Sequence, residues 1–130
     1  MDEKTNEELL IEANDLIWKD NNNHYRNKEN CKQAKELYEK LVNKNYTPAF
    51  LYLAALCKRE GNYDKAEELY EKIFDINMDA ASELGLIYEN RHDYVKAKYF
   101  YEISIKFGSK SSCFRLEEMN NYLNNLIIKK

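Results

Sequence analysis

An internal repeat with a spacing of 31–32 residues constrains this chain more than any other feature. Three segments superpose without gaps: KQAKELYEK at 32–40, DKAEELYEK at 64–72 and VKAKYFYEI at 95–103. An alanine and a tyrosine recur in register within them, as Ala34, Ala66 and Ala97 and as Tyr38, Tyr70 and Tyr101. Because small and aromatic residues recur in phase, charged helical composition alone does not account for the similarity. The repeat predicts short units that bury their apolar faces by stacking on their neighbours.

A second similarity indicates that each unit holds two helices. Residues 49–63 align with residues 80–94, and they match Leu53 with Leu84, Ala54 with Gly85, Leu56 with Ile87 and Tyr63 with Tyr94. The apolar residues of both stretches keep a helical period. The chain holds only 3 Gly and 1 Pro, which are too few for the many turns of an all-β sandwich or barrel. We therefore expect an all-α fold built from helix hairpins.

Turn and capping residues predict where these helices begin and end. Thr5 and Glu8 have the form of a capping box, in which each side chain binds the backbone N–H of the other residue. Thr47, followed by Pro48, is expected to cap the next hairpin. The other expected N-caps are Asn62, Asp79 and Asp93, and the expected helix ends are Gly61 and Gly108. A final helix carries Leu116, Met119, Leu123 and Leu126 on one side and is expected to close the array.

The third unit carries a pattern of Leu, Gly and Tyr in its first helix and of Tyr, Ala and Tyr in its second, at Leu84, Gly85, Tyr88, Tyr94, Ala97 and Tyr101. With this pattern the chain resembles the tetratricopeptide repeat and its relative, the Sel-one-like repeat, over about residues 5–108. The resemblance implies a single all-α domain over 1–130, an α-solenoid of antiparallel helix hairpins. Its repeats would cover about 5–45, 46–77 and 78–108, and a capping helix about 110–128. The short period, the missing Pro near each unit's end and a polar insertion at 19–30 depart from the tetratricopeptide pattern.

In the families that the chain resembles, the first helix of each hairpin lines a concave groove that binds a ligand. The resemblance therefore implies a partner-binding groove lined by Leu10, Asn14, Trp18, Leu51, Ala55, Lys58, Arg59, Ser82, Leu86, Glu89 and Asn90. Tetratricopeptide domains that bind a C-terminal carboxylate place Lys and Asn at such positions, where this chain has mostly Leu, Ala and Ser. The sequence therefore does not support a carboxylate-binding site in the groove. The groove is thus expected to bind a helix or an extended segment of another protein. Trp18 is either an interface anchor or packed against its own neighbours.

Composition and motifs disfavour several other functions. The net charge of −3 disfavours a nucleic-acid partner. The three cysteines form no CxxC pair and have no histidine at a metal-ligand spacing, so we expect reduced thiols in or near the core, with no zinc site and no disulfide framework. Without a nucleophile motif or a glycine-rich phosphate loop, we expect no catalytic residues, no cofactor and no metal. The acidic first residues and the lack of a long apolar run predict a cytosolic protein with no membrane partner.

Two functional hypotheses remain open at this point. The chain is either a non-catalytic adaptor that binds a segment of another protein, or a dedicated inhibitor or escort of one target, such as an immunity protein, an antitoxin or a secretion chaperone. RNA binding of the pentatricopeptide kind would need a basic face, and the net charge of −3 counts against it. Residues 1–20 hold seven acidic and two basic side chains, and residues 106–130 hold five basic and two acidic ones. We therefore expect a monomer or a weak head-to-tail self-association.

Overall fold

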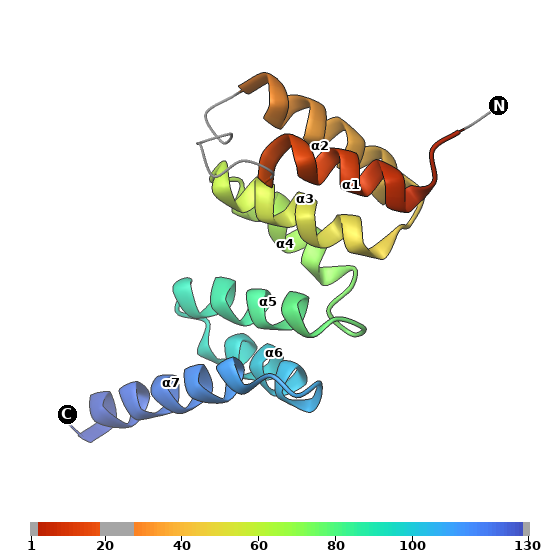
Figure 1. Ribbon diagram of the computed structural model, residues 1–130. Helices are drawn as coiled ribbons and strands as arrows, with labels where there is room; N and C mark the ends of the chain where they lie inside the picture. Colours follow the sequence, from red (N-terminus) through yellow and green to blue (C-terminus); the bar gives the residue numbers. More distant parts are fainter. Residues whose placement is uncertain (1–2, 19–27, 129–130) are drawn as a thin grey trace. The chain divides into compact units, whose positions relative to one another are not determined.

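The computed structural model describes residues 3–18 and 28–128, and these residues form seven α-helices and no strand (Figure 1). The helices are α1 (Asn6–Trp18), α2 (Lys28–Asn43), α3 (Thr47–Arg59), α4 (Tyr63–Glu71), α5 (Met78–Asn90), α6 (Tyr94–Lys106) and α7 (Lys110–Ile128). The expected all-α class is confirmed. The chain divides into two compact units, Met1–Leu69 and Tyr70–Lys130, and the boundary falls inside α4.

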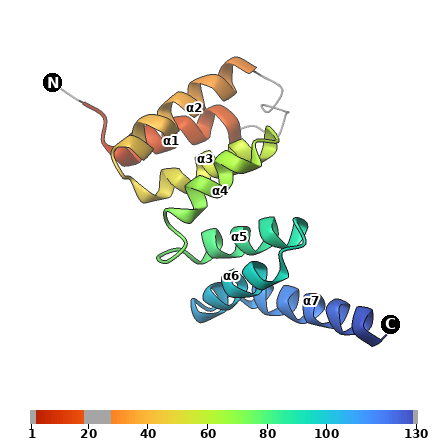
Figure 2. The same ribbon diagram turned by 180° about the vertical axis from the view of Figure 1, so that it is seen from behind.

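In the first unit, α1 packs on α2 and α2 packs on α3 (Figure 2). Ala13 on α1 and Ala34 on α2 are fully buried, and such small side chains let helix backbones approach closely. Tyr38, one of the repeated tyrosines, is also fully buried. Its hydroxyl donates a hydrogen bond to Oδ1 of Asn14 at 2.5 Å, and its ring stacks on Tyr52 with 5.9 Å between the ring centroids. The repeated Ala and Tyr positions of this unit therefore belong to its core.

In the second unit, α5 and α6 form a hairpin and α7 packs on α6 (Figure 2). Gly85 lies against the ring of Tyr101, so close that a Cβ atom at Gly85 would lie 2.5 Å from Cδ1 of that ring. The ring of Phe100 stacks on Tyr88 at 5.5 Å and meets the ring of Phe74 edge to face at 5.2 Å. Gly85 therefore lies at a close contact between α5 and α6.

Hydrogen bonds between serines connect the three helices of the second unit. The Oγ atom of Ser82 on α5 lies 2.5 Å from that of Ser104 on α6 and 2.8 Å from that of Ser112 on α7. Ser104 also donates a hydrogen bond to the carbonyl oxygen of Met78 at 3.1 Å. Ser104 and Ser112 are almost completely buried, and these contacts satisfy their hydroxyl groups.

Four turns between helices share one backbone geometry. Each contains one residue in the left-handed region, and these residues are Asn45 (φ 59°), Gly61 (φ 82°), His92 (φ 62°) and Gly108 (φ 100°). The next residue donates its N–H to the carbonyl five residues earlier, in the pairs Tyr46 to Leu41 (3.0 Å), Asn62 to Cys57 (2.8 Å), Asp93 to Tyr88 (2.9 Å) and Ser109 to Ser104 (3.1 Å). This is the hydrogen bond of a Schellman motif, which ends a helix tightly. The expected helix ends at Gly61 and Gly108 are confirmed.

In three of these turns, the residue that completes the motif also caps the next helix. The side chains of Asn62, Asp93 and Ser109 each accept a hydrogen bond from the backbone N–H three residues later, at 3.2, 3.2 and 3.1 Å. The expected caps at Asn62 and Asp93 are therefore confirmed. Because each of these three turns reverses the chain through one left-handed residue, the helices on either side of it are joined by a very short connection.

Two expected caps are wrong. The N-cap of α3 is Tyr46, which completes the preceding Schellman motif, so Thr47 is already the first helical residue. The N-cap of α5 is Asn77, whose Oδ1 accepts a hydrogen bond from the N–H of Ala80 at 3.0 Å. Asp79 lies instead in the first turn of α5, where its negative charge interacts favourably with the positive end of the helix dipole.

The apolar side of α7 is covered over only part of its length. Met119 is buried, and Leu116 and Leu123 are half-buried. Farther along, Leu126 is 44% exposed, Ile127 72% and Ile128 80%. Within the described residues, the predicted closing helix therefore packs on its unit as far as Leu123 and exposes its last apolar turn.

Candidate functional site

The structure places the expected groove residues of the first unit in different environments. Leu10 packs against a buried cluster of Leu9, Leu41 and Ala49, and Asn14 accepts the hydrogen bond from Tyr38. Leu51, Ala55 and Lys58 are half-buried on α3, and Arg59 is exposed. The Trp18 side chain and residues 19–27 of the polar insertion lie outside the described residues. Leu10 and Asn14 thus serve the packing of their own hairpin.

A cavity of about 260 Å³ lies beside the end of α3 and is lined by Cys31, Leu56, Arg59 and Glu60. An ion pair at 3.3 Å between Lys35 Nζ and a carboxylate oxygen of Glu60 lies next to it. Burial raises the pKa of the Cys31 thiol, and the negative charge of Glu60 raises that pKa further. The thiol at this cavity is therefore held in its protonated, poorly nucleophilic form.

The other two cysteines differ in their environment. Cys57 is buried, as expected, and burial is the main reason that its pKa is raised. The expectation of a core position is wrong for Cys113, which is exposed on α7. Its side chain lies one position after the buried Ser112, and neighbouring positions of a helix face different directions.

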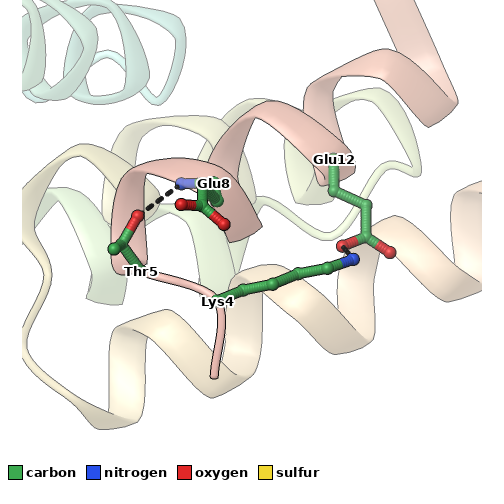
Figure 3. A network of polar contacts seen from close by, with 4 residues as sticks. All are labelled: Lys4, Thr5, Glu8 and Glu12. Carbon is green, nitrogen blue, oxygen red and sulfur yellow. Dashed lines mark hydrogen bonds and ion pairs between the residues drawn. The ribbon is translucent and has the colours of Figure 1, made fainter. Parts of the chain in front are cut away.

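The outer surface of α1 carries a second, shallow cavity of about 400 Å³, lined by Lys4, Glu8, Ile11, Glu12, Asp15 and Leu16. Figure 3 shows Lys4 reaching along the helix to Glu12, where Nζ lies 2.7 Å from a carboxylate oxygen. In the same view, the N–H of Glu8 donates to Oγ1 of Thr5 at 3.2 Å, which confirms Thr5 as a cap. Ile11 is 59% exposed in this acidic surface.

The expected groove residues of the second unit also divide into two groups. Ser82 belongs to the buried serine contacts, and Leu86 is half-buried on α5. Glu89 and Asn90, in the last turn of α5, line a cavity of about 410 Å³, which we call the hairpin-end cavity. Its other lining residues are His92, Tyr94, Glu118, Met119 and Tyr122.

Three elements of the second unit meet at the hairpin-end cavity. The end of α5 supplies Glu89 and Asn90, and the following turn supplies His92. The start of α6 supplies Tyr94, and the middle of α7 supplies the remaining three residues, Glu118, Met119 and Tyr122. Nδ1 of His92 lies 2.8 Å from the hydroxyl of Tyr94, and the rings of Tyr94 and Tyr122 are 6.3 Å apart. Burial raises the pKa of Tyr94, and the neighbouring Tyr122 adds to this shift. The phenol therefore stays neutral and polar beside the carboxylates.

The orientation of Glu89 is fixed by Tyr101. The hydroxyl of this fully buried tyrosine donates a hydrogen bond to Oε1 of Glu89 at 2.6 Å. Burial raises the pKa of Tyr101 far above its usual value, and the hydrogen bond and charge of Glu89 raise it further, while Arg115 acts in the opposite direction. Tyr101 is thus a permanent donor that holds one oxygen of Glu89.

Sequence reasoning identified Glu89 and Asn90 but missed most of the hairpin-end cavity. In the sequence, His92 and Glu118 belong to no motif, and Tyr94 belongs to the repeat pattern. The structure places His92 and Tyr94 in direct hydrogen-bond contact and leaves Tyr94 half-buried. The one sequence signal that could have found the site is the short turn after α5, which brings the start of α6 back beside the end of α5.

Among the described residues, no three His, Cys, Asp or Glu side chains are grouped so that they could hold a metal ion. In the same part of the chain, every helix is too short or too polar to traverse a lipid bilayer. The chain matches no protein-family model, and no curated protein matches it.

Proposed function

We propose that this chain is a non-catalytic protein-binding module of the tetratricopeptide or Sel-one-like kind. In this proposal its hairpins stack as an α-solenoid, and the first helix of each hairpin presents side chains to a segment of another cytosolic protein. The resemblance in sequence suggests this function, and the geometry of the turns supports the repeat.

The spacing of the four equivalent turns is the observation that carries the proposal. The turns after α3 and α5 have their left-handed residues at Gly61 and His92, which are 31 residues apart, as are Ala66 and Ala97. The turns after α2 and α6 use Asn45 and Gly108 in the same way. The spacing of the turns at Gly61 and His92 thus equals the period of the sequence repeat, which supports the proposal of a repeat protein.

The side chains on the first helices are suited to contact another protein. On α3, Ala54 is fully buried, whereas the neighbouring Leu51 and Ala55 are only half-buried. On α5, Gly85 is buried and Leu86 is half-buried. Accessible apolar side chains beside a buried row are the kind of surface on which the apolar face of a helix or an extended segment packs.

The proposal is tested by affinity purification from the native cells with mass spectrometry, followed by binding measurements with the purified partner. Leu51→Arg and Leu86→Arg place a charge on the proposed surface. Val95→Arg is the matched control, because Val95 is 83% exposed on α6, a second helix. We expect the control to retain the partner and the two test variants to lose it, with unchanged helical circular dichroism. A partner that binds all three variants equally contradicts the proposed surface.

A further inference from the structure

The hairpin-end cavity combines carboxylates with aromatic rings. Glu89 and Glu118 bring two negative charges to it from α5 and α7, and Tyr94 and Tyr122 bring two rings from α6 and α7. The buried Met119 adds an apolar side chain to the lining. None of the seven lining residues is a lysine or an arginine. This combination matches a cation that is also flat and weakly hydrated.

We propose that the hairpin-end cavity binds the guanidinium group of an arginine side chain from a partner protein. The inference rests on the proposed function, and it adds which side chain the partner presents and where this chain receives it.

The carboxylates have acceptor capacity left for such a cation. Tyr101 occupies Oε1 of Glu89, which leaves Oε2 available. Within the described part of the chain, the carboxylate of Glu118 takes part in no hydrogen bond or ion pair. Arg115, one turn before Glu118 on α7, acts on the hydroxyl of Tyr101 and is not part of the cavity lining. A guanidinium has five N–H donors in a fixed plane and can bind two carboxylates at once.

The aromatic rings favour arginine over lysine. The planes of Tyr94 and Tyr122 are inclined by 50°, with 6.3 Å between the ring centroids. A planar guanidinium stacks on a tyrosine face while its edge forms hydrogen bonds, whereas an ammonium group is compact and strongly hydrated. Tyr122 is 50% exposed, so its ring is accessible from solvent.

The experiment measures binding of N-acetylarginine amide to the full chain by two-dimensional NMR. N-acetylcitrulline amide is the neutral probe of the same shape, and N-acetyllysine amide carries the charge without the plane. We expect the arginine probe to shift the amide signals of residues 89–94 and 118–122 with an affinity in about the millimolar range, and the other two probes to bind at least about threefold more weakly. Equal binding of citrulline excludes charge recognition, and equal binding of lysine excludes the guanidinium assignment.

Matched variants locate the site. Glu118→Gln and Tyr122→Ala are each expected to weaken the arginine probe about threefold to tenfold. Their controls on the same helix are Glu117→Gln and Phe114→Ala, which alter exposed residues outside the cavity lining and should leave the affinity unchanged. If the test and control variants behave alike, the inference is wrong.

This result is separable from the proposed function. A partner that is captured by the wild type and lost by Leu86→Arg, but bound equally by Glu118→Gln, supports the protein-binding module and overturns the arginine site. If instead arginine binding depends on Glu118 but the partner binds equally to the wild type and to Leu86→Arg, the arginine site is supported and the proposed binding surface on the first helices is wrong.

Discussion

Gly85 and Tyr101 are in close contact across the α5–α6 hairpin: an added Cβ at Gly85 would lie 2.5 Å from both Cδ1 and Cε1 of the Tyr101 ring. That ring is fully buried, so it has no free space into which it can move. We therefore expect Gly85→Ala to lower the free energy of unfolding by about 1–3 kcal/mol, as overpacking does elsewhere. Urea denaturation of the wild type and of the variant measures this difference in the free energy of unfolding.

The sign of this effect is diagnostic. An alanine in place of glycine inside a helix normally stabilises it by about 0.5–1 kcal/mol. Ala54 is the equivalent of Gly85 in the preceding repeat, and Ala54→Gly is the matched control. Both substitutions are expected to destabilise the protein, although they change the side chain in opposite directions. A stabilised Gly85→Ala variant would show that the hairpin can relax around the extra methyl group.

Gly61 is required for a different physical reason. Its φ of 82° lies in the left-handed region, and an added Cβ would meet no atom within 4 Å. Only backbone strain opposes a side chain there, so Gly61→Ala is expected to cost about 1–2 kcal/mol in the free energy of unfolding. Asn45→Gly relieves the same strain in the turn after α2 and should raise the midpoint of urea denaturation. If Gly61→Ala leaves the free energy of unfolding unchanged, the turn adopts another geometry in solution.

The core of the fold could be predicted from the sequence because helix packing repeats wherever the same residues recur. Ala34, Ala97 and Gly85 occupy positions that recur between the repeats, and all three are buried. The helix caps were less predictable. At α5, Asn77 caps the helix in place of Asp79, two residues later. At α3, the position of the preceding Schellman motif makes Tyr46 the N-cap in place of Thr47. That position depends on which residue takes the left-handed conformation.

Periodicity could not predict where α4 ends or where the hairpin-end cavity forms. The apolar period of the α4 sequence continues through Ile73 and Phe74, but the helix ends at Glu71, and Ile73 is buried in the turn that follows. An apolar residue can be buried in either conformation, so the pattern does not distinguish them. The cavity brings His92 beside Glu118, which come from elements separated by all of α6. Residues this far apart in the sequence share no local pattern, so periodicity does not place them at one cavity.

Alkaline pH should destabilise the chain through Tyr101. Tyrosine in an unfolded chain has a pKa near 10, and burial and Glu89 raise the pKa of Tyr101 in the folded state. Above about pH 10 the unfolded state therefore loses a proton that the folded state keeps, and the stability falls as pH rises. We expect Tyr101→Phe to reduce this slope by up to about 1.4 kcal/mol per pH unit.

The measurement is urea denaturation at several pH values between neutral pH and pH 11. At neutral pH, Tyr101→Phe should cost about 1–2 kcal/mol, because it removes a hydrogen bond to a charged group. The control is Tyr63→Phe, at a tyrosine that is 51% exposed. An alkaline slope that is identical in the wild type and in Tyr101→Phe would exclude Tyr101 as its source.

The opposite charges near the two ends of the sequence predict a weak head-to-tail association that depends on salt. The surface of α1 carries Glu8, Glu12 and Asp15 around the exposed Ile11, and residues 106–130 have an excess of basic side chains. Attraction between exposed charges is screened over about 8 Å at 0.15 M salt and over about 30 Å at 0.01 M. We expect light scattering to show a higher average mass at 0.01 M salt than at 0.3 M, and Glu8→Lys with Asp15→Lys to abolish the difference. Glu36→Lys with Glu39→Lys, at exposed positions of α2, makes the same change in net charge and should preserve it. A monomeric mass at both salt concentrations, at millimolar protein, would exclude the association.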